Sequence, residues 1–348
     1  MATRNIVPRA NNEGKLGTSE KKWAEVNAIT FNGSLSGNAT SSSGAAKLTT
    51  ARTISLSGDA TGSVSFNGSS NVSIPVTLAR TTGLTDLIPD GAAAHNCLYR
   101  GKDITADFNS GKMSTNIANG TFRDIFVGDY IDVPMTVNGT SIGNVVWRVA
   151  HCDYFLHHSD ANLTTHHIVM VPDDILNTNI RMAASNTSVG GYLATEMWKT
   201  TLPLYTNAIQ NAFGSAHVLS HRELLTNAIS ETAASTAGSG WVGSSSGWAW
   251  ADVVANIMSE PMVYGGTVFS SSGFDVGNRK TQLALFNLCH DRTIAGYRGN
   301  HSDRKWYWLS AVASSTRFAN AGSDGDANCF DASRQSGGGG IRPYFLLR

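Results

Sequence analysis

The sequence has no cluster of like charges and no long apolar run. Its 348 residues include 26 basic and 26 acidic side chains, which gives a formal net charge of zero. Grouped Lys and Arg supply the attraction for nucleic acid, so their absence argues against a nucleic-acid partner. Residues 1–14 lack the apolar segment of a signal peptide, and no run reaches the length of a membrane span. We therefore expect no membrane insertion, and a route out of the cell by lysis or within an assembled particle.

Cysteine is scarce. Cys97, Cys152, Cys289 and Cys329 are far apart in the sequence and form no CxxC pair. We expect reduced thiols, with a disulfide as the alternative, because a protein assembled in a reducing cytoplasm does not oxidise them first. Nothing beside Cys289 or Cys329 predicts the lowered pKa of a reactive thiol. We expect no cofactor.

Small and polar residues are abundant, with 35 glycines and many Ser, Thr and Asn. These residues disfavour helices and favour short strands joined by turns. An apolar content of 41% supports at least one sizeable core. We therefore predict a β-rich α+β protein, with changes in composition near residues 30, 80 and 120 that mark segment boundaries.

Residues 306–348 are apolar at both ends and polar in the middle. The ends predict two buried strands, and we assign Trp308 and Leu309 to the frame, with Arg342 and Pro343 closing the same β-layer. Residues 313–335 are mostly small and polar with a few aromatics and arginines, which suits adaptable recognition by a display loop. The predicted receptor-binding residues are Ser314, Ser315, Thr316, Arg317, Phe318, Asn320, Ser323, Asp324, Asp326, Asn328, Phe330, Asp331, Ser333 and Arg334.

Two groups in this stretch, Trp308-Leu309-Ser310 and Gly340-Ile341-Arg342-Pro343, resemble the C-terminal signature of C-type-lectin-like domains at the tips of bacteriophage tail fibres. They also resemble the variable proteins of diversity-generating retroelements and, more distantly, the formylglycine-generating enzyme fold. Phrases from FVGDY to SEPMVYG are similar to a domain of tail proteins from phages of gut bacteria. The resemblance implies a C-type-lectin-like receptor-binding head over residues 121–348, with a loop diversified by a retroelement.

Residues 1–30 contain IVPRANNEGKLGTSEKKWAEV, which resembles the N-terminal adaptor of phage tail fibres. The resemblance implies attachment to baseplate or tail-tip proteins, through Ile6, Val7, Pro8 and Trp23. A tryptophan in so polar a segment requires a partner surface. Trp23 either fills a pocket on a tail protein or packs within its own trimer.

Residues 31–80 contain a partial repeat, in which SLSGNAT over residues 34–40 returns as SLSGDAT over residues 55–61. Apolar side chains alternate from Val72 to Leu78, which predicts a half-buried strand. Two repeats are too few to bury a core within one chain, so we predict a homotrimeric intertwined β-shaft, and LSGDATGSVSFNGSSNVSIPVTLA resembles such shafts. The alternative is a flexible linker. Residues 81–120 are predicted to be a joint.

Within residues 121–348, we predict strands over residues 126–131, 145–150 and 168–171, and a hairpin at Asn138-Gly139. A helix is predicted from Leu204 to Phe213, ended by Gly214, a second behind the S-x-x-E box of residues 220–223, and a third over residues 253–258. The Ser/Gly-rich residues 235–247, followed by Trp248 and Trp250, predict an exposed loop that is a second candidate binding element. Trp241 belongs to this loop.

The chemical motifs do not form a complete active site. GSSSG over residues 243–247 matches the nucleophile elbow but lacks the strand and helix that the elbow requires. Adjacent histidines at residues 157–158 and 166–167 cannot share one ion on a strand. The acidic residues Asp324, Asp326 and Asp331 suggest either a loose calcium site, a depolymerase pair or a solvated turn. We expect no enzyme and no metal.

The sequence thus predicts a phage tail fibre or tip protein, located in the virion tail, that attaches to a glycan or protein receptor on the bacterial surface. One alternative is a structural collar or decoration fibre without receptor binding. The other is a surface-polysaccharide depolymerase, which would release soluble saccharide from host envelopes.

Overall fold

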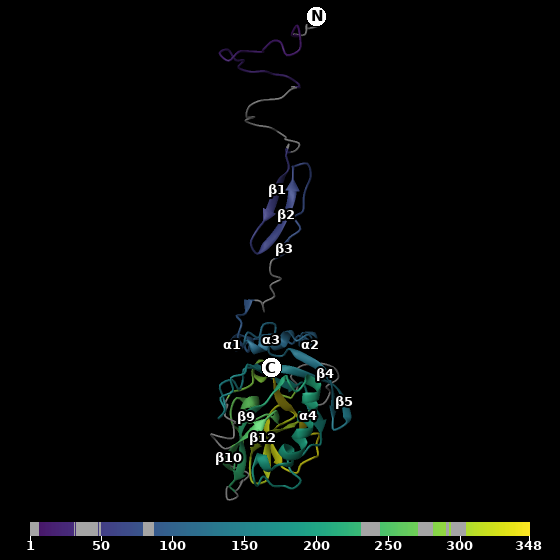
Figure 1. The fold of residues 1–348 in the computed structure, drawn as a ribbon, viewed down its shortest axis with the longest axis vertical. Helices are drawn as coiled ribbons and strands as arrows, with labels where there is room; N and C mark the ends of the chain where they lie inside the picture. Colours follow the sequence, from purple (N-terminus) through teal and green to yellow (C-terminus); the bar gives the residue numbers. More distant parts are fainter. Residues whose placement is uncertain are drawn as a thin grey trace. The chain divides into compact units, whose positions relative to one another are not determined.

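The computed structural model describes residues 7–30, 32, 48, 50–78, 87–230, 244–270, 281–289, 292–293 and 304–348. The chain divides into two compact units, Met1–Thr81 and Thr82–Arg348. The boundary lies close to residue 80, where we predict the shaft to end. The described part is built from several sheets and short helices, which confirms the β-rich α+β class (Figure 1).

The first unit contains an antiparallel sheet of three strands, β1 (Arg52–Leu56), β2 (Ala60–Phe66) and β3 (Thr77–Leu78). Gly58, at φ 94°, lies in the turn between β1 and β2, a conformation that glycine adopts without steric cost. Of the strand predicted over residues 72–78, only β3 forms, because Pro75 has no N–H for a ladder hydrogen bond. The earlier repeat copy, residues 34–40, lies outside the described residues.

Residues 87–120 belong to the second unit. They form three short helices, α1 (Ala92–His95), α2 (Thr105–Asn109) and α3 (Lys112–Ala118), which lie together beside β4 (Figure 1). The side chains of Ile104, Met113 and Ile117 are buried in a hydrophobic core of this unit. The segment predicted to be a joint is therefore part of the globular fold from residue 87 onward.

A six-stranded sheet has the order β11-β16-β6-β5-β4, with β8 paired to β16. Asn138 and Gly139 have φ of 48° and 78°, which suits a tight hairpin turn and confirms the hairpin predicted there. Strands β6 and β16 are buried along their whole length, as continuous apolar runs predict. The strands are β4 (Tyr130–Val137), β5 (Thr140–Cys152), β6 (Ile168–Pro172), β8 (Val218–Leu219), β11 (Ala255–Ile257) and β16 (Pro343–Leu347).

A five-stranded sheet has the order β14-β13-β12-β15-β7. Its strands are β7 (Asn177–Thr178), β12 (Tyr307–Val312), β13 (Arg317–Ala321), β14 (Ala327–Asp331) and β15 (Gly340–Ile341). A Cβ at Gly340 would overlap the carbonyl group of Asn177, so β15 approaches β7 more closely than a side chain allows. This close approach explains part of the glycine run at residues 337–340.

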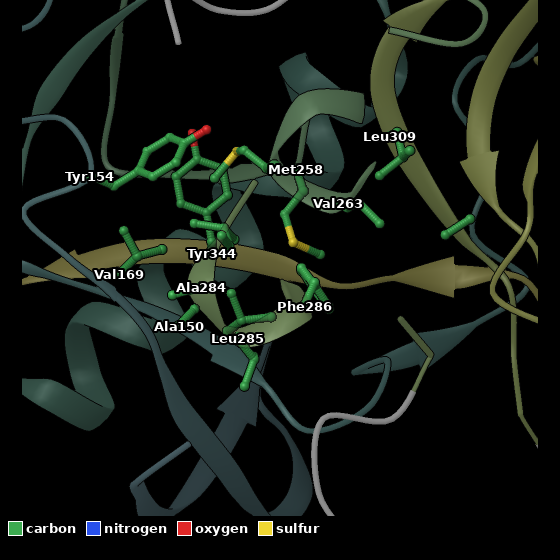
Figure 2. Packing of buried hydrophobic residues seen from close by; sticks show 14 of the residues in the cluster. Ala150, Tyr154, Val169, Met258, Val263, Ala284, Leu285, Phe286, Leu309 and Tyr344 are labelled. Atoms are coloured by element: carbon green, nitrogen blue, oxygen red, sulfur yellow. The ribbon is translucent and has the colours of Figure 1, made fainter. Parts of the chain in front are cut away.

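Three hydrophobic cores cover the faces of these two sheets. The first contains side chains of both sheets, such as Val169 and Tyr344 from the six-stranded sheet and Leu309 from the five-stranded one, and Figure 2 shows its packing. The second lies on the other face of the six-stranded sheet and includes Trp147. The third lies on the other face of the five-stranded sheet and includes Trp308.

One of the three predicted helices in this unit is confirmed. Helix α4 (Leu202–Phe213) ends at Gly214, whose φ is 83°. The other two are wrong. Residues 221–229 and 245–253 pair with each other as the two-stranded ribbon of β9 (His221–Ile229) and β10 (Ser245–Val253), and most of the helix predicted over residues 253–258 is strand β11, which pairs with β16. The remaining helices are η2 (Tyr192–Ala194), η3 (Met197–Thr201), α5 (Glu260–Tyr264) and α6 (Ala284–Cys289).

His167 is buried inside the second unit, and its hydrogen-bond partners suit a neutral imidazole ring. Its Nδ1 lies 2.9 Å from the carbonyl oxygen of Thr165, to which it donates, and its Nε2 accepts a hydrogen bond of 3.0 Å from the N–H of Phe155. Burial lowers the pKa of this imidazole to about 3, because a charged ring would lose its hydration. In the unfolded chain the pKa returns to about 6.5, so the unfolded state takes up the proton first as the pH falls.

We expect this group to leave stability unchanged above about pH 6.5 and to lower the free energy of unfolding by about 2–3 kcal/mol between pH 6.5 and 4.5. Urea unfolding across this pH range measures the slope. His167→Gln should flatten it, whereas His157→Asn, at an exposed position, should preserve it. Equal slopes in wild type and His167→Gln would contradict the assignment.

Candidate functional site

The predicted display loop is a β-hairpin. Strands β13 and β14 pair antiparallel from Arg317↔Asp331 to Ala321↔Ala327, and the turn between them is closed by a 2.8 Å hydrogen bond from the N–H of Gly322 to the carbonyl oxygen of Asp326. A Cβ at Gly322 would overlap the Asp326 carboxylate, so a larger residue there would require that side chain to move. The expectation of a pliable loop over residues 313–335 is therefore wrong, because a backbone ladder fixes most of it.

Three of the predicted recognition residues are buried. Phe318 and Asn320 are fully buried, and Ser314 is 1% exposed. Phe318 packs in the third core together with Trp308. The carbonyl oxygen of Ser314 accepts a 2.5 Å hydrogen bond from the hydroxyl of Ser188. The prediction that these three side chains face solvent is wrong, because both faces of β13, which carries Phe318 and Asn320, are covered and Ser314 is buried just before it.

The other eleven predicted residues lie at least partly on the surface. Asp324 and Asp326 are exposed in the turn. The side chains of intermediate exposure are Ser315, Thr316, Arg317, Ser323, Asn328, Phe330, Asp331, Ser333 and Arg334. Because β14 is the edge strand of its sheet, these residues form one accessible margin. Their role in binding a receptor stays a prediction.

Two pairs of side chains organise this margin. The guanidinium of Arg334 lies 3.8 Å from the centre of the Phe330 ring and 5.7 Å from that of Trp306, and the two rings meet edge to face at 4.8 Å. Arg317 forms an ion pair of 2.9 Å with Asp331 across the hairpin. We call Arg317, Phe330, Asp331 and Arg334 the hairpin edge surface.

The buried indole of Trp306 supports the hairpin edge surface from below. Its indole N–H donates a 3.0 Å hydrogen bond to the carbonyl oxygen of Gly337, and a Cβ at Gly339 would overlap the indole ring. Trp306 is 5% exposed. The cation–π contacts of Arg334 therefore rest on a buried ring, which limits the motion of the arginine.

Asp326 and Asp331 are too far apart for the carboxylate pair of a depolymerase. Asp326 immediately precedes β14 and Asp331 is its last residue, so about 16 Å of extended chain separates them. Carboxylates of glycosidases lie within about 10 Å of each other. Among the described residues, no group of three or more His, Cys, Asp or Glu side chains is arranged to hold a metal ion.

All four cysteines are free thiols, as we expect. Burial raises the pKa of Cys152 well above its usual value and also raises the pKa of Cys329. A raised pKa favours the protonated thiol, which is the opposite of an activated thiolate. Neither residue has the environment of the reactive thiol that a formylglycine-type oxidase requires.

No family model, curated protein or solved structure matches this chain. The assignment of a function therefore depends on the geometry of the residues themselves. Within the described segments, no helix is both long and apolar enough to cross a bilayer.

The predicted tail-attachment residues are exposed where the structure describes them. Val7 is 73% exposed and Trp23 is 64% exposed, and Pro8 is exposed as well. Ile6 lies outside the described residues. Attachment of these residues to tail proteins stays a prediction.

The second candidate element lies on the β9–β10 ribbon. Residues 231–243, which include Trp241, lie outside the described part. Trp248 and Trp250 stand on β10 opposite Thr226 and Leu224 of β9. Both tryptophans are of intermediate exposure, and on the other face of the ribbon Leu225 and Ala251 pack against the third core.

Proposed function

We propose that this chain is a bacteriophage tail fibre or tip protein whose second unit, a C-type-lectin-like head, contacts the bacterial surface through the hairpin edge surface. The observation that carries the proposal is the arrangement of Phe330 and Arg334 over the buried Trp306. Arginine and aromatic side chains dominate binding energy at interfaces. A site that is held rigid before binding loses little conformational entropy when it binds.

The environment of β14 supports this proposal. An edge strand presents backbone groups as well as side chains to a partner. The carboxylates of Asp324 and Asp326 and the guanidinium of Arg317 supply charged hydrogen-bonding groups of both signs on the same margin. Such a mixed surface suits a polar ligand, either a glycan or a protein loop.

The experiment that tests the function is a pull-down of host envelope fractions with the full-length chain. We expect retention of an outer-surface component. Retention of tail proteins alone would support a structural collar or decoration fibre instead. Release of soluble saccharide from the envelope would support a depolymerase.

The first unit supports assembly of three chains. One face of its sheet carries the apolar side chains of Ile54, Leu56, Val64 and Leu78, which share a face by register. Ile54 is 43% exposed, Leu56 is 41% exposed and Leu78 is 57% exposed. The opposite face carries Ser and Thr. Arg52 lies at the end of the same face. The apolar part of the face, which this chain leaves partly exposed, is best buried by further copies of the same shaft, and we propose a homotrimer.

We expect the full-length chain to have three times the 36.9 kDa mass of one chain in light scattering. The double variant Ile54→Asp/Leu78→Asp should shift the population to monomer, because charges on the apolar face oppose its burial. Ser55→Asp, on the hydroxyl-rich face of the same strand, is the matched control and should stay trimeric. A monomeric wild-type chain at micromolar concentration would contradict the shaft assignment.

A further inference from the structure

A hollow of about 320 Å³ lies at the base of the β9–β10 ribbon. Polar side chains form most of its wall, with Asn162 and Thr165 from the loop before β6, Ser220 before β9, and Asp252 near the end of β10. His221, Arg222 and four further residues of the loop before β6 also line it. Hydroxyl, amide, carboxylate and guanidinium groups therefore border one small volume.

Two carboxylates hold the guanidinium of Arg222 in place. Its Nε and Nη2 donate to Asp160 at 2.8 Å and 3.0 Å, and its Nη1 donates to Asp252 at 2.9 Å. The hydrogen bond from Arg222 lowers the pKa of Asp160. With one guanidinium between two carboxylates, the group of three carries a formal net negative charge. This charge disfavours an anionic ligand.

His221 lines the same hollow, but its ring is packed in the interior. The residue is 4% exposed, its ring lies 4.4 Å from that of Phe155, and its Nε2 lies 3.0 Å from the Glu223 carboxylate. Because successive residues of a strand point to opposite faces, the imidazole faces the core and the guanidinium of Arg222 faces the hollow.

An aromatic surface continues outward from the hollow. The register pairs Arg222 with Asp252, Leu224 with Trp250 and Thr226 with Trp248, so the two indoles share a face with the ion pair. Alternate residues of a strand lie about 7 Å apart, which is comparable to the length of one sugar unit in a chain. Indole rings present a large apolar face, suited to the C–H face of a pyranose.

We propose that the hollow and the two tryptophans form a binding subsite for a neutral, hydroxyl-rich oligosaccharide. Vicinal hydroxyls of one sugar unit donate to Asp252 and accept from Arg222, while the next units lie over Trp250 and Trp248. The net negative charge selects against uronates and phosphorylated sugars. The proposal rests on the proposed function only for the source of the ligand, a bacterial surface glycan.

The test is titration of the full-length protein by isothermal calorimetry with maltotriose, cellotriose, mannotriose and chitotriose, and with trigalacturonate as the acidic counterpart. We expect at least one neutral trisaccharide to bind with millimolar or tighter affinity and trigalacturonate not to bind. Arg222→Met and, separately, Trp250→Ala should each weaken binding by about tenfold or more. Asn211→Ala, at an exposed position on α4, is the control and should bind as wild type does.

Failure of all four neutral trisaccharides to bind, binding of the acidic one alone, or equal affinity in wild type, Arg222→Met and Trp250→Ala would overturn the subsite. Melting temperatures of the variants establish that each is folded. Attachment to cells without binding of any neutral trisaccharide would overturn the subsite while the proposed function stands. Binding of a trisaccharide without attachment to any bacterial surface would overturn the proposed function and leave the subsite intact.

Discussion

The substitution Arg342→Met is expected to lower the free energy of unfolding of the second unit by about 3 kcal/mol or more. Arg342 is fully buried. Its guanidinium donates three hydrogen bonds to backbone carbonyls, at 3.0 Å to Pro172, 2.7 Å to Arg292 and 3.1 Å to Asp173. It also lies 5.4 Å and 5.1 Å from the ring centres of Phe286 and Tyr307.

The size of this loss in the free energy of unfolding depends on which groups accept the hydrogen bonds of Arg342. When a buried ion pair is replaced as a whole by apolar side chains, the loss is small, because both charges disappear. Here the acceptors are backbone carbonyls, which no side-chain substitution removes. Methionine therefore leaves the buried carbonyls of Pro172 and Asp173 without this donor, while the carbonyl of Arg292 keeps a 2.6 Å hydrogen bond from the hydroxyl of Tyr307.

Urea unfolding followed by circular dichroism measures the change. Arg342→Lys should recover only part of the loss, because an ammonium group lacks the planar fork that reaches three carbonyls. Arg348→Met is the matched control, since Arg348 is exposed at the other end of β16 and should cost under about 1 kcal/mol. Equal stability of Arg342→Met and wild type would show that the buried guanidinium does not hold the strands of the C-terminal frame together.

The second large effect is expected in binding. The triple variant Arg317→Ala/Phe330→Ala/Arg334→Ala should weaken attachment of the full-length chain to host cells by about 30-fold or more, because removal of one interface hot spot alone costs about 2 kcal/mol. All three side chains are at least partly exposed, so the fold should survive. In the proposed homotrimer the effect would be larger, since each weakened contact also reduces the avidity.

Two controls make this prediction specific. Arg123→Ala removes an exposed arginine that is paired with Asp90 far from the hairpin in sequence, and attachment should be unchanged. Phe318→Ala removes a buried ring from the third core, and it should lower stability before it changes attachment. If the triple variant attached as strongly as wild type, the hairpin edge surface would not be the binding site.

Local signals in the sequence correctly predicted several elements. The Asn138-Gly139 turn and helix α4 are determined by residues close in sequence, through a turn that favours positive φ and an apolar stripe ended by Gly214. The burial of Trp308 and Arg342 also agrees with the prediction of a structural frame. In each case the preference of a short segment agrees with its tertiary environment.

The errors arise where distant residues decide the structure. The S-x-x-E box at residues 220–223 and the apolar spacing behind it are typical of a helix, yet pairing with residues 245–253 makes this segment a strand. In β13, small residues such as Ala319 and Ala321 resemble a loop in composition, although they are buried beside Tyr307 of the first core. The wall of the hollow combines residues from 159 to 252, and no spacing in the sequence predicts that arrangement.

The most direct test of the account is amide hydrogen exchange of the full-length chain with and without host envelope. The account predicts slower exchange on binding at residues 327–334 of the hairpin edge, with no change in the buried strand β16. Slower exchange confined to the N-terminal residues 7–30, with the hairpin unaffected, would contradict the claim that this edge contacts the bacterial surface.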